Sequence, residues 1–217
     1  MCQLVYTSLF FRCGYCKYDH YHAYNIASDI YIQFQMQRIV DSLNNATIIA
    51  IELINSRPIE NALVEGMSLL KEPAQKGDAK AQFVLGYCYG GYVTWHEDSK
   101  KMIDHEKEAY WFSKAAEQGI IGAMYYLANC YSEGKGVEKS SEKEYYWNKK
   151  AALSGFPESM LRLGDLYRDG VIERQPFYKK VLDRNIDSAL YWWNKAYEVG
   201  NLSIKQQAEK RLQKLYN

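Results

Sequence analysis

The sequence predicts an all-α fold, a right-handed α–α solenoid of stacked helix hairpins. Two phrases that recur in a fixed order within the 217 residues carry this prediction. The first is LGYCYG, LANCYSEG and LGDLYRDG, and the second is WFSKAAEQG, WNKKAALSG and WWNKAYEVG. The underlying period is 36 residues, with insertions of 6 and 9 residues that both fall between the first phrase and the second. In chain order the phrases begin at Leu85, Trp111, Leu127, Trp147, Leu163 and Trp192.

The first phrase has the spacing of an amphipathic helix. Ala81, Leu85 and Tyr89 recur every four residues and so share one face of a helix. Gly86 lowers helix propensity beside that face, and we expect it to let the backbone of another helix come close. The phrase therefore predicts a helix that packs against a neighbour.

The second phrase predicts a partner helix for the first. Trp111 shares a face with Ala115 and Ala116, and one large ring opposite small residues is typical of interdigitated packing. We expect Trp147, at the same place in the middle unit, to be packed in the core, where its truncation costs about 3–5 kcal/mol. A single hairpin cannot bury its own apolar face, whereas stacked hairpins can. Each second phrase ends in a glycine that fits a left-handed helix cap, and these glycines are Gly119, Gly155 and Gly200.

In order and spacing, the two phrases resemble the Sel-1-like repeat, a relative of the tetratricopeptide repeat, over roughly residues 78–200. The resemblance implies a Sel-1-like superhelix whose concave face, lined by the first helix of each unit, binds a partner. Glu108 and Glu144 depart from the family's alanine three residues before the tryptophan, and Tyr197 replaces the second alanine of the last unit. The middle unit matches the family at Ala123, Leu127, Ala128, Tyr131, Gly134, Gly136, Val137, Trp147, Lys150, Ala151, Ala152 and Gly155.

The segments that flank the repeats predict further helices. The stretch SLLKEPAQKG, which ends at Gly77, resembles the second phrase, so residues 58–71 are expected to form the second helix of a degenerate unit. Pro73 should kink or shorten that helix. Residues 46–54 are rich in β-branched side chains, but a helix is favoured over a strand in a helical array. Another helix is expected from Ser28.

The last segment, from Ser203, has apolar residues on one side only and is expected to close the array as a capping helix. The expected organisation is an N-terminal arm over residues 1–24, helices with the degenerate unit over 25–77, repeats over 78–119, 120–155 and 156–200, and the capping helix over 201–217.

Composition argues against several classes of partner. The 27 basic and 26 acidic residues nearly cancel, so no global field favours nucleic acid or an anionic membrane, although the last loop is locally basic.

The odd count of five cysteines favours a reducing compartment. The longest apolar run contains Glu52 and is too short for a membrane span, and the first residues make a poor signal peptide. A cytoplasmic protein is expected.

The stretch RCGYCKYDHYH, residues 12–22, contains four potential ligands of a structural zinc. They lie closer together than known zinc spacings allow, and a thioredoxin-type C-x-x-C needs a βαβ setting. We expect a flexible or loosely docked arm and no cofactor. The four metal candidates are Cys13, Cys16, His20 and His22.

The remaining chemical groups do not predict catalysis. Cys88 and Cys130 occupy the same slot of consecutive units and are expected to be buried thiols. Residues 95–106, with His96 and His105, are expected to form a solvated charged loop. The sequence has no phosphate-binding loop and no nucleophile elbow, so we expect a protein that is not an enzyme.

The leading functional hypothesis is a scaffold that binds a partner protein or peptide on its concave face, and the oligomeric state stays open. The alternative is a dedicated inhibitor, such as an immunity protein that neutralises a toxin enzyme. Residues two before and two after the central leucine, with Leu161 among them, are expected to point away from the packing face, and Tyr126 and Arg162 come one residue further on. The alternative is that some of these rings only pack against the neighbouring helix. Tyr and Arg, which occur in this combined set, are typical of binding hot spots. The expected contact residues are Phe83, Tyr87, Tyr125, Tyr126, Asn129, Arg162 and Asp165.

Overall fold

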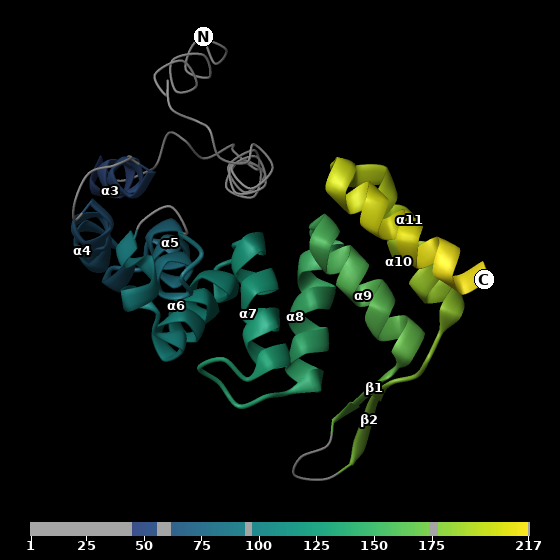
Figure 1. Cartoon of the computed structure of the whole chain (residues 1–217). Helices are drawn as coiled ribbons and strands as arrows, with labels where there is room; N and C mark the ends of the chain where they lie inside the picture. Colours follow the sequence, from purple (N-terminus) through teal and green to yellow (C-terminus); the bar gives the residue numbers. More distant parts are fainter. Residues whose placement is uncertain (1–44, 56–61, 94–96, 174–177, 217) are drawn as a thin grey trace. The chain divides into compact units, whose positions relative to one another are not determined.

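The computed structural model describes residues 45–55, 62–93, 97–173 and 178–216, which all belong to one compact unit of the chain. Within this unit each helix packs against the next along the chain (Figure 1). The fold is an all-α right-handed solenoid of helix hairpins, as predicted. The expected arm over residues 1–24 and the helix expected from Ser28 lie outside the described residues.

Each repeat contributes one first helix and one second helix, as the two phrases predict. The second helices of the first two repeats also pack against the first helix of the following repeat, so the array is continuous from one hairpin to the next. The pairs are α5 (Ala79–Tyr89) with α6 (His105–Glu117), α7 (Ile121–Glu133) with α8 (Ser141–Leu153), and α9 (Pro157–Asp169) with α10 (Ile186–Val199).

An earlier hairpin precedes the repeats. It consists of α3 (Asn45–Asn55) and α4 (Ala62–Gln75), and α4 packs on α5. The β-branched segment is therefore a helix, because packing in the array outweighs its local preference. Within α3, Thr47 is buried and its hydroxyl donates a hydrogen bond to Asp78 at 3.2 Å. Pro73 lies inside α4, which ends two residues later.

The helix α11 (Leu202–Tyr216) follows the last repeat and packs on α10 and α9. It begins one residue before the expected Ser203, because the side chain of Asn201 accepts a hydrogen bond from the amide of Ile204 at 3.1 Å. Ile204 and Ala208 on its inner side are buried. The segment therefore packs on the last hairpin of the array.

Polar side chains begin the second helices, and glycines end two of them. Asp104, Ser140 and Asn185 cap α6, α8 and α10 by accepting a backbone hydrogen bond from the first helical turn. Gly119 and Gly155, which follow α6 and α8, have the expected positive φ of 92° and 94°.

The left-handed cap expected at Gly200 is wrong, because its φ and ψ are −76° and 160°. The lack of room for a side chain explains the glycine at this position instead. A Cβ placed there would lie 2.6 Å from the Cβ of Ile204, at the point where α11 turns back onto α10.

One backbone hydrogen bond recurs in every repeat. The amide of the residue that caps the second helix donates to the carbonyl of the tyrosine near the end of the first helix, and we call it the closing hydrogen bond. It joins Asp104 to Tyr89 at 2.9 Å, Ser140 to Tyr131 at 3.0 Å and Asn185 to Tyr167 at 2.7 Å. The two helices of a repeat therefore meet in the same way whatever lies between them.

A small residue on the first helix receives a ring from the second. A Cβ added at Gly86 would lie 2.7 Å from the ring of Phe112, and one added at Gly164 would lie 2.5 Å from Cδ1 of Trp193. Our expectation that Gly86 admits a helix backbone is therefore corrected: the space is filled by a side chain. Phe112 and Trp193 are fully buried, as is Asn148 at the equivalent position of the middle repeat.

The tryptophans that open the second phrase are half-buried rather than fully buried. Trp111 and Trp147 pack along the edge of the core, and the ammonium of Lys150 lies 5.1 Å from the ring of Trp147. The residue that follows each tryptophan takes the central position. The expectation that Trp147 is a core residue is therefore only partly correct.

Both insertions lie between the two helices of a repeat, as predicted. The first contains a 3-10 helix, η2 (Glu97–Met102), and the third repeat carries an antiparallel hairpin of β1 (Val171–Glu173) and β2 (Lys179–Leu182). Glu173 accepts hydrogen bonds from the hydroxyl of Ser140 and the amide of Glu142, both at 2.9 Å. The hairpin therefore docks on the beginning of α8.

The adjacent tryptophans of α10 allow a direct test of this packing. Trp193→Ala removes a fully buried ring whose indole nitrogen donates to the carbonyl of Leu161, so the free energy of unfolding should fall by about 3–5 kcal/mol. Trp192→Ala removes a half-buried ring and should cost clearly less. Denaturant unfolding measures both variants, and equal losses would contradict the assignment of Trp193 as the central residue.

Candidate partner-binding site

Several aromatic residues expected to line the groove lie inside the array. Tyr87 and Tyr126 are only 8% and 7% exposed. The ring of Tyr126 stacks on Phe112 at 5.1 Å and 14°, and it meets Tyr87 edge-on at 5.6 Å. Phe83 is half-buried and lies 6.2 Å from both tyrosine rings. Tyr87 and Tyr126 are therefore core residues, contrary to the expectation that they line the groove.

The reason is that the first helices have neighbours on more than one side. Helix α5 packs against α4, α6 and η2, and α7 packs against α6 and α8. A side chain that turns away from its own second helix therefore meets another repeat or a loop. The loop residue Tyr92 completes the cluster at 4.8 Å from Tyr126 and 5.1 Å from Tyr87. As a result, every residue of α5 is buried or half-buried.

Two expected contact residues on α7 remain partly accessible. Tyr125 and Asn129 are half-buried, and their spacing of four residues places them on one face of the helix. The ring of Tyr125 meets Tyr126 edge-on at 5.3 Å and lies 5.2 Å from Phe156. The core rings thus hold Tyr125 in position while part of its surface stays open.

Arg162 joins α9 to α8. Its Nε donates to Oε1 of the buried Glu144 at 2.6 Å, and its Nη2 lies 3.5 Å from the hydroxyl of Ser132. A buried carboxylate is costly unless it is paired, so the guanidinium stabilises Glu144 where it is. Arg162 remains partly exposed and keeps an open side toward solvent.

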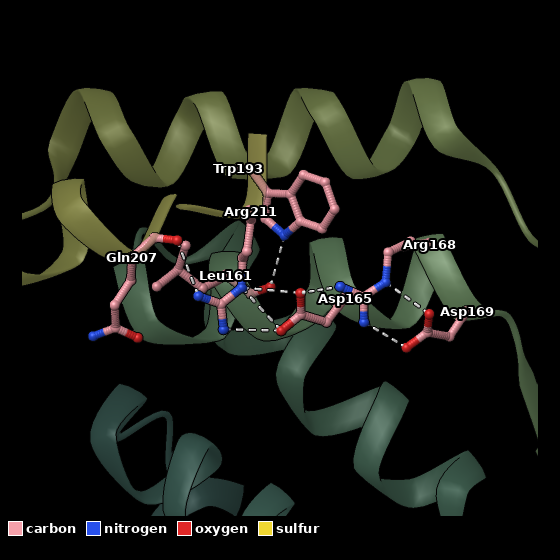
Figure 2. A network of polar contacts seen from close by, with 7 residues as sticks. All are labelled: Leu161, Asp165, Arg168, Asp169, Trp193, Gln207 and Arg211. Carbon is pink, nitrogen blue, oxygen red and sulfur yellow. Dashed lines mark hydrogen bonds and ion pairs between the residues drawn. The ribbon is translucent and has the colours of Figure 1, made fainter. Parts of the chain in front are cut away.

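Asp165 is engaged by the capping helix, as Figure 2 shows. Its carboxylate is buried and accepts three hydrogen bonds of 2.9–3.1 Å from the guanidinium of Arg211 in α11. Arg168 lies 3.5 Å from the same carboxylate and donates two bonds of 2.7 Å to Asp169, which lowers the pKa of Asp169. Asp165 therefore anchors α11 to α9, and its neighbour Leu161 is buried beneath Trp193.

Sequence reasoning missed the structural role of the acids that depart from the family pattern. Glu108 is fully buried, and its carboxylate accepts a 2.8 Å hydrogen bond from the hydroxyl of Tyr92 and lies 2.6 Å from Nδ1 of His105. Burial, and then the charge of Glu108, raise the pKa of Tyr92. Glu144 has the same place in the next repeat. The signal available in the sequence was that Glu108 and Glu144 each stand where the family has alanine.

The expectation for the two cysteines is confirmed, and the expectation for the charged loop is corrected in part. Cys88 and Cys130 are buried free thiols, as predicted, and burial raises the pKa of each to about 12. Asp104 and His105, expected in a solvated loop, instead begin α6. His96 lies outside the described residues.

Within residues 45–55, 62–93, 97–173 and 178–216, no group of three or more His, Cys, Asp or Glu side chains could hold a metal ion. The four N-terminal candidates, Cys13, Cys16, His20 and His22, lie outside those ranges. No helix in the same part of the chain is long and apolar enough to cross a membrane.

The fold and its repeated contacts define a helical-repeat protein. The Sel1 repeat family matches residues 79–120, 121–156 and 157–201, which together exceed half of the chain. The chain therefore belongs to the Sel1 repeat family, as the two phrases indicate. A comparison with curated proteins finds no match.

A comparison with solved structures finds a similar fold in another Sel1 repeat protein. A Sel1 repeat protein from Oxalobacter formigenes has 22% identity and a TM-score of 0.61 over 73% of this chain. The match covers 42% of that protein, so the chain spans less than half of its length. Cysteine rich protein B of Helicobacter pylori has 24% identity, a TM-score of 0.45, and coverage of 64% of this chain and 95% of its own. A protective antigen of uropathogenic Escherichia coli with an SLR fold has 20% identity, a TM-score of 0.37, and coverage of 82% and 44%.

The contact between Asp165 and Arg211 provides a test of the site geometry. Arg211→Gln leaves the buried carboxylate of Asp165 without its main donor, so the free energy of unfolding should fall by about 1–3 kcal/mol. Lys210→Gln changes an exposed charge on the same helix and serves as the control. Urea unfolding measures both, and a double-mutant cycle with Asp165→Asn isolates the pair. Indistinguishable losses for Arg211→Gln and Lys210→Gln would mean that Arg211 does not anchor the helix.

Proposed function

We propose that this Sel1 repeat protein is a non-catalytic scaffold that binds another protein along its repeats. The observation that carries the proposal is the uninterrupted packing of three repeats in tandem, which presents equivalent residues at regular steps. Sel1 repeat proteins are generally scaffolds of this kind. The partner is a protein or peptide, because the near-neutral charge of the chain offers little attraction for nucleic acid.

The proposed contact surface on the first helices centres on Tyr125, Asn129 and Arg162. Tyr125 rests on core rings, and Arg162 is oriented by Glu144, so both side chains are held in place before a partner arrives. Pre-ordered groups lose less entropy on binding, which favours affinity. Phe83 extends the surface into the first repeat, while Tyr87, Tyr126 and Asp165 support it from within. The odd number of cysteines supports a proposed cytoplasmic location.

Affinity capture with quantitative mass spectrometry tests the proposal. The tagged full chain serves as bait in the cells from which it comes, beside the double variant Tyr125→Ala/Asn129→Ala. Removal of a hot-spot ring typically costs about 2 kcal/mol or more, so the double variant should lose its partner by about thirtyfold at matched concentrations. The helical circular dichroism spectrum of the variant should stay unchanged.

The matched control is Gln206→Ala/Gln213→Ala, which truncates two exposed side chains of α11. It should retain the partner. If no protein is enriched over an untagged control, the scaffold function is refuted. If both double variants retain the partner equally, the first helices are not the contact surface.

A further inference from the structure

Among the helices of the repeats, the second helices carry the exposed aromatic rings. The tyrosine directly before each repeat's tryptophan is the most exposed ring of its helix. Tyr110, Tyr146 and Tyr191 are 53%, 49% and 58% exposed. By contrast, the rings of α5 and α7 are all buried or half-buried. The same exposed side chain at the same place in three successive repeats has no role in the packing described above.

Each of these tyrosines is held by the tryptophan that follows it. The two rings meet edge-on, with centroids 4.9 Å apart for Tyr110, 5.1 Å for Tyr146 and 5.2 Å for Tyr191. The interplanar angles are 75°, 80° and 82°. Because each tryptophan is half-buried, its ring fixes the exposed tyrosine against the helix. The three tyrosine rings are thus ordered in the same way.

The orientation of the second helices explains why these positions recur at the surface. Five residues after each tyrosine stands a fully buried alanine, Ala115, Ala151 or Ala196. Five residues turn a helix by about 140° from its starting direction. The tyrosines therefore lie on the side of each helix that faces away from its first helix.

A lysine follows each tyrosine one turn later on the same side. The ammonium of Lys114 lies 5.9 Å from the ring of Tyr110, and that of Lys150 lies 5.1 Å from the ring of Tyr146. Lys195 has the equivalent place in α10. We call these three pairs the tyrosine–lysine row, and its members are Tyr110, Lys114, Tyr146, Lys150, Tyr191 and Lys195.

Two of the three lysines of the row have no ion-pair partner among the described residues, and the third has a long one. In the part of the chain that the structure describes, Lys114 and Lys150 form no ion pair, and Lys195 is 3.9 Å from Glu198. Acidic residues occur in the first turn of each second helix, where the helix dipole favours them. In α8 that acid, Glu142, is already bound by Lys179 at 2.7 Å. Charge complementarity therefore points to an acidic occupant.

We propose that the tyrosine–lysine row docks an acidic segment of a partner protein. Each repeat offers one ordered ring, one phenolic hydroxyl and one ammonium, which suit a carboxylate side chain and the methylene groups that carry it. This inference rests on the proposed scaffold function and assigns a second surface to it, with a defined partner chemistry.

The test measures binding of a fluorescein-labelled peptide of alternating glutamate and glycine to the full chain by fluorescence anisotropy. At low ionic strength the wild type should bind it, and an otherwise identical glutamine peptide should bind at least about tenfold more weakly. The triple variant Lys114→Gln/Lys150→Gln/Lys195→Gln should weaken binding of the glutamate peptide by about tenfold or more. Tyr110→Ser/Tyr146→Ser/Tyr191→Ser should weaken it in the same direction with an unchanged circular dichroism spectrum.

The control variant Lys71→Gln/Lys210→Gln/Lys214→Gln removes the same charge from exposed positions outside the row and should stay within about twofold of the wild type. Equal losses in the two lysine variants, or no binding by the wild type, would overturn the proposal.

Sedimentation velocity tests whether the wild type self-associates. Self-association that the row variant abolishes would also overturn the proposal and would make a second copy the occupant. If capture from cells yields a partner that the row variant retains in full, the row proposal fails while the scaffold function stands.

Discussion

The closing hydrogen bond is the constraint on which the rest of the array depends. It ties the amide that opens each second helix to the tyrosine carbonyl near the end of the first, at 2.7–3.0 Å in all three repeats. Everything between those two residues is free to vary, and the chain places a 3-10 helix there in the first repeat and a β-hairpin in the third. A fixed junction lets repeats with unequal loops stack in one register, because the loop does not determine how the helices meet. The insertions can therefore acquire contacts of their own, as Glu173 does with the start of α8.

Side chains then fill the space that this junction fixes. Gly86 and Gly164 leave room for Phe112 and Trp193. Buried acids bind Tyr92 in the loop of the first repeat, Arg162 of the following repeat and Arg211 of α11. Buried ion pairs add little stability compared with apolar packing, but breaking one is costly. Their value here is that each acid binds a side chain from another element, which favours one arrangement of the stack over others. The oxygen of Asn148, buried without a hydrogen-bond partner among the described residues, is a local cost in the middle repeat.

The sequence was sufficient for the fold because the repeated phrases report local geometry. Leu85, Ala115 and the capping glycines Gly119 and Gly155 depend on contacts within one hairpin, and their roles were predictable. Gly200 was not, because its environment is set by the turn into α11 rather than by a helix cap. The candidate site was predicted less well. A helical wheel identifies the face of α5 that is turned away from α6. It does not identify the neighbouring elements that cover Tyr87 from other sides. Exposure depends on the whole stack, and for that reason the tyrosines before each tryptophan were overlooked.

The central claim is that the side chains of the first helices pack largely inside the array, whereas the second helices carry the ordered, exposed tyrosine rings. Hydroxyl-radical footprinting with peptide mass spectrometry tests this claim directly, because a tyrosine side chain is oxidised at a rate that follows its exposure to solvent. The structure predicts rapid oxidation of Tyr110, Tyr146 and Tyr191 and strong protection of Tyr87 and Tyr126 in the native chain, with the difference abolished in denaturant. Equal oxidation of the two groups in the native chain, or protection of Tyr146 with oxidation of Tyr126, would contradict the account.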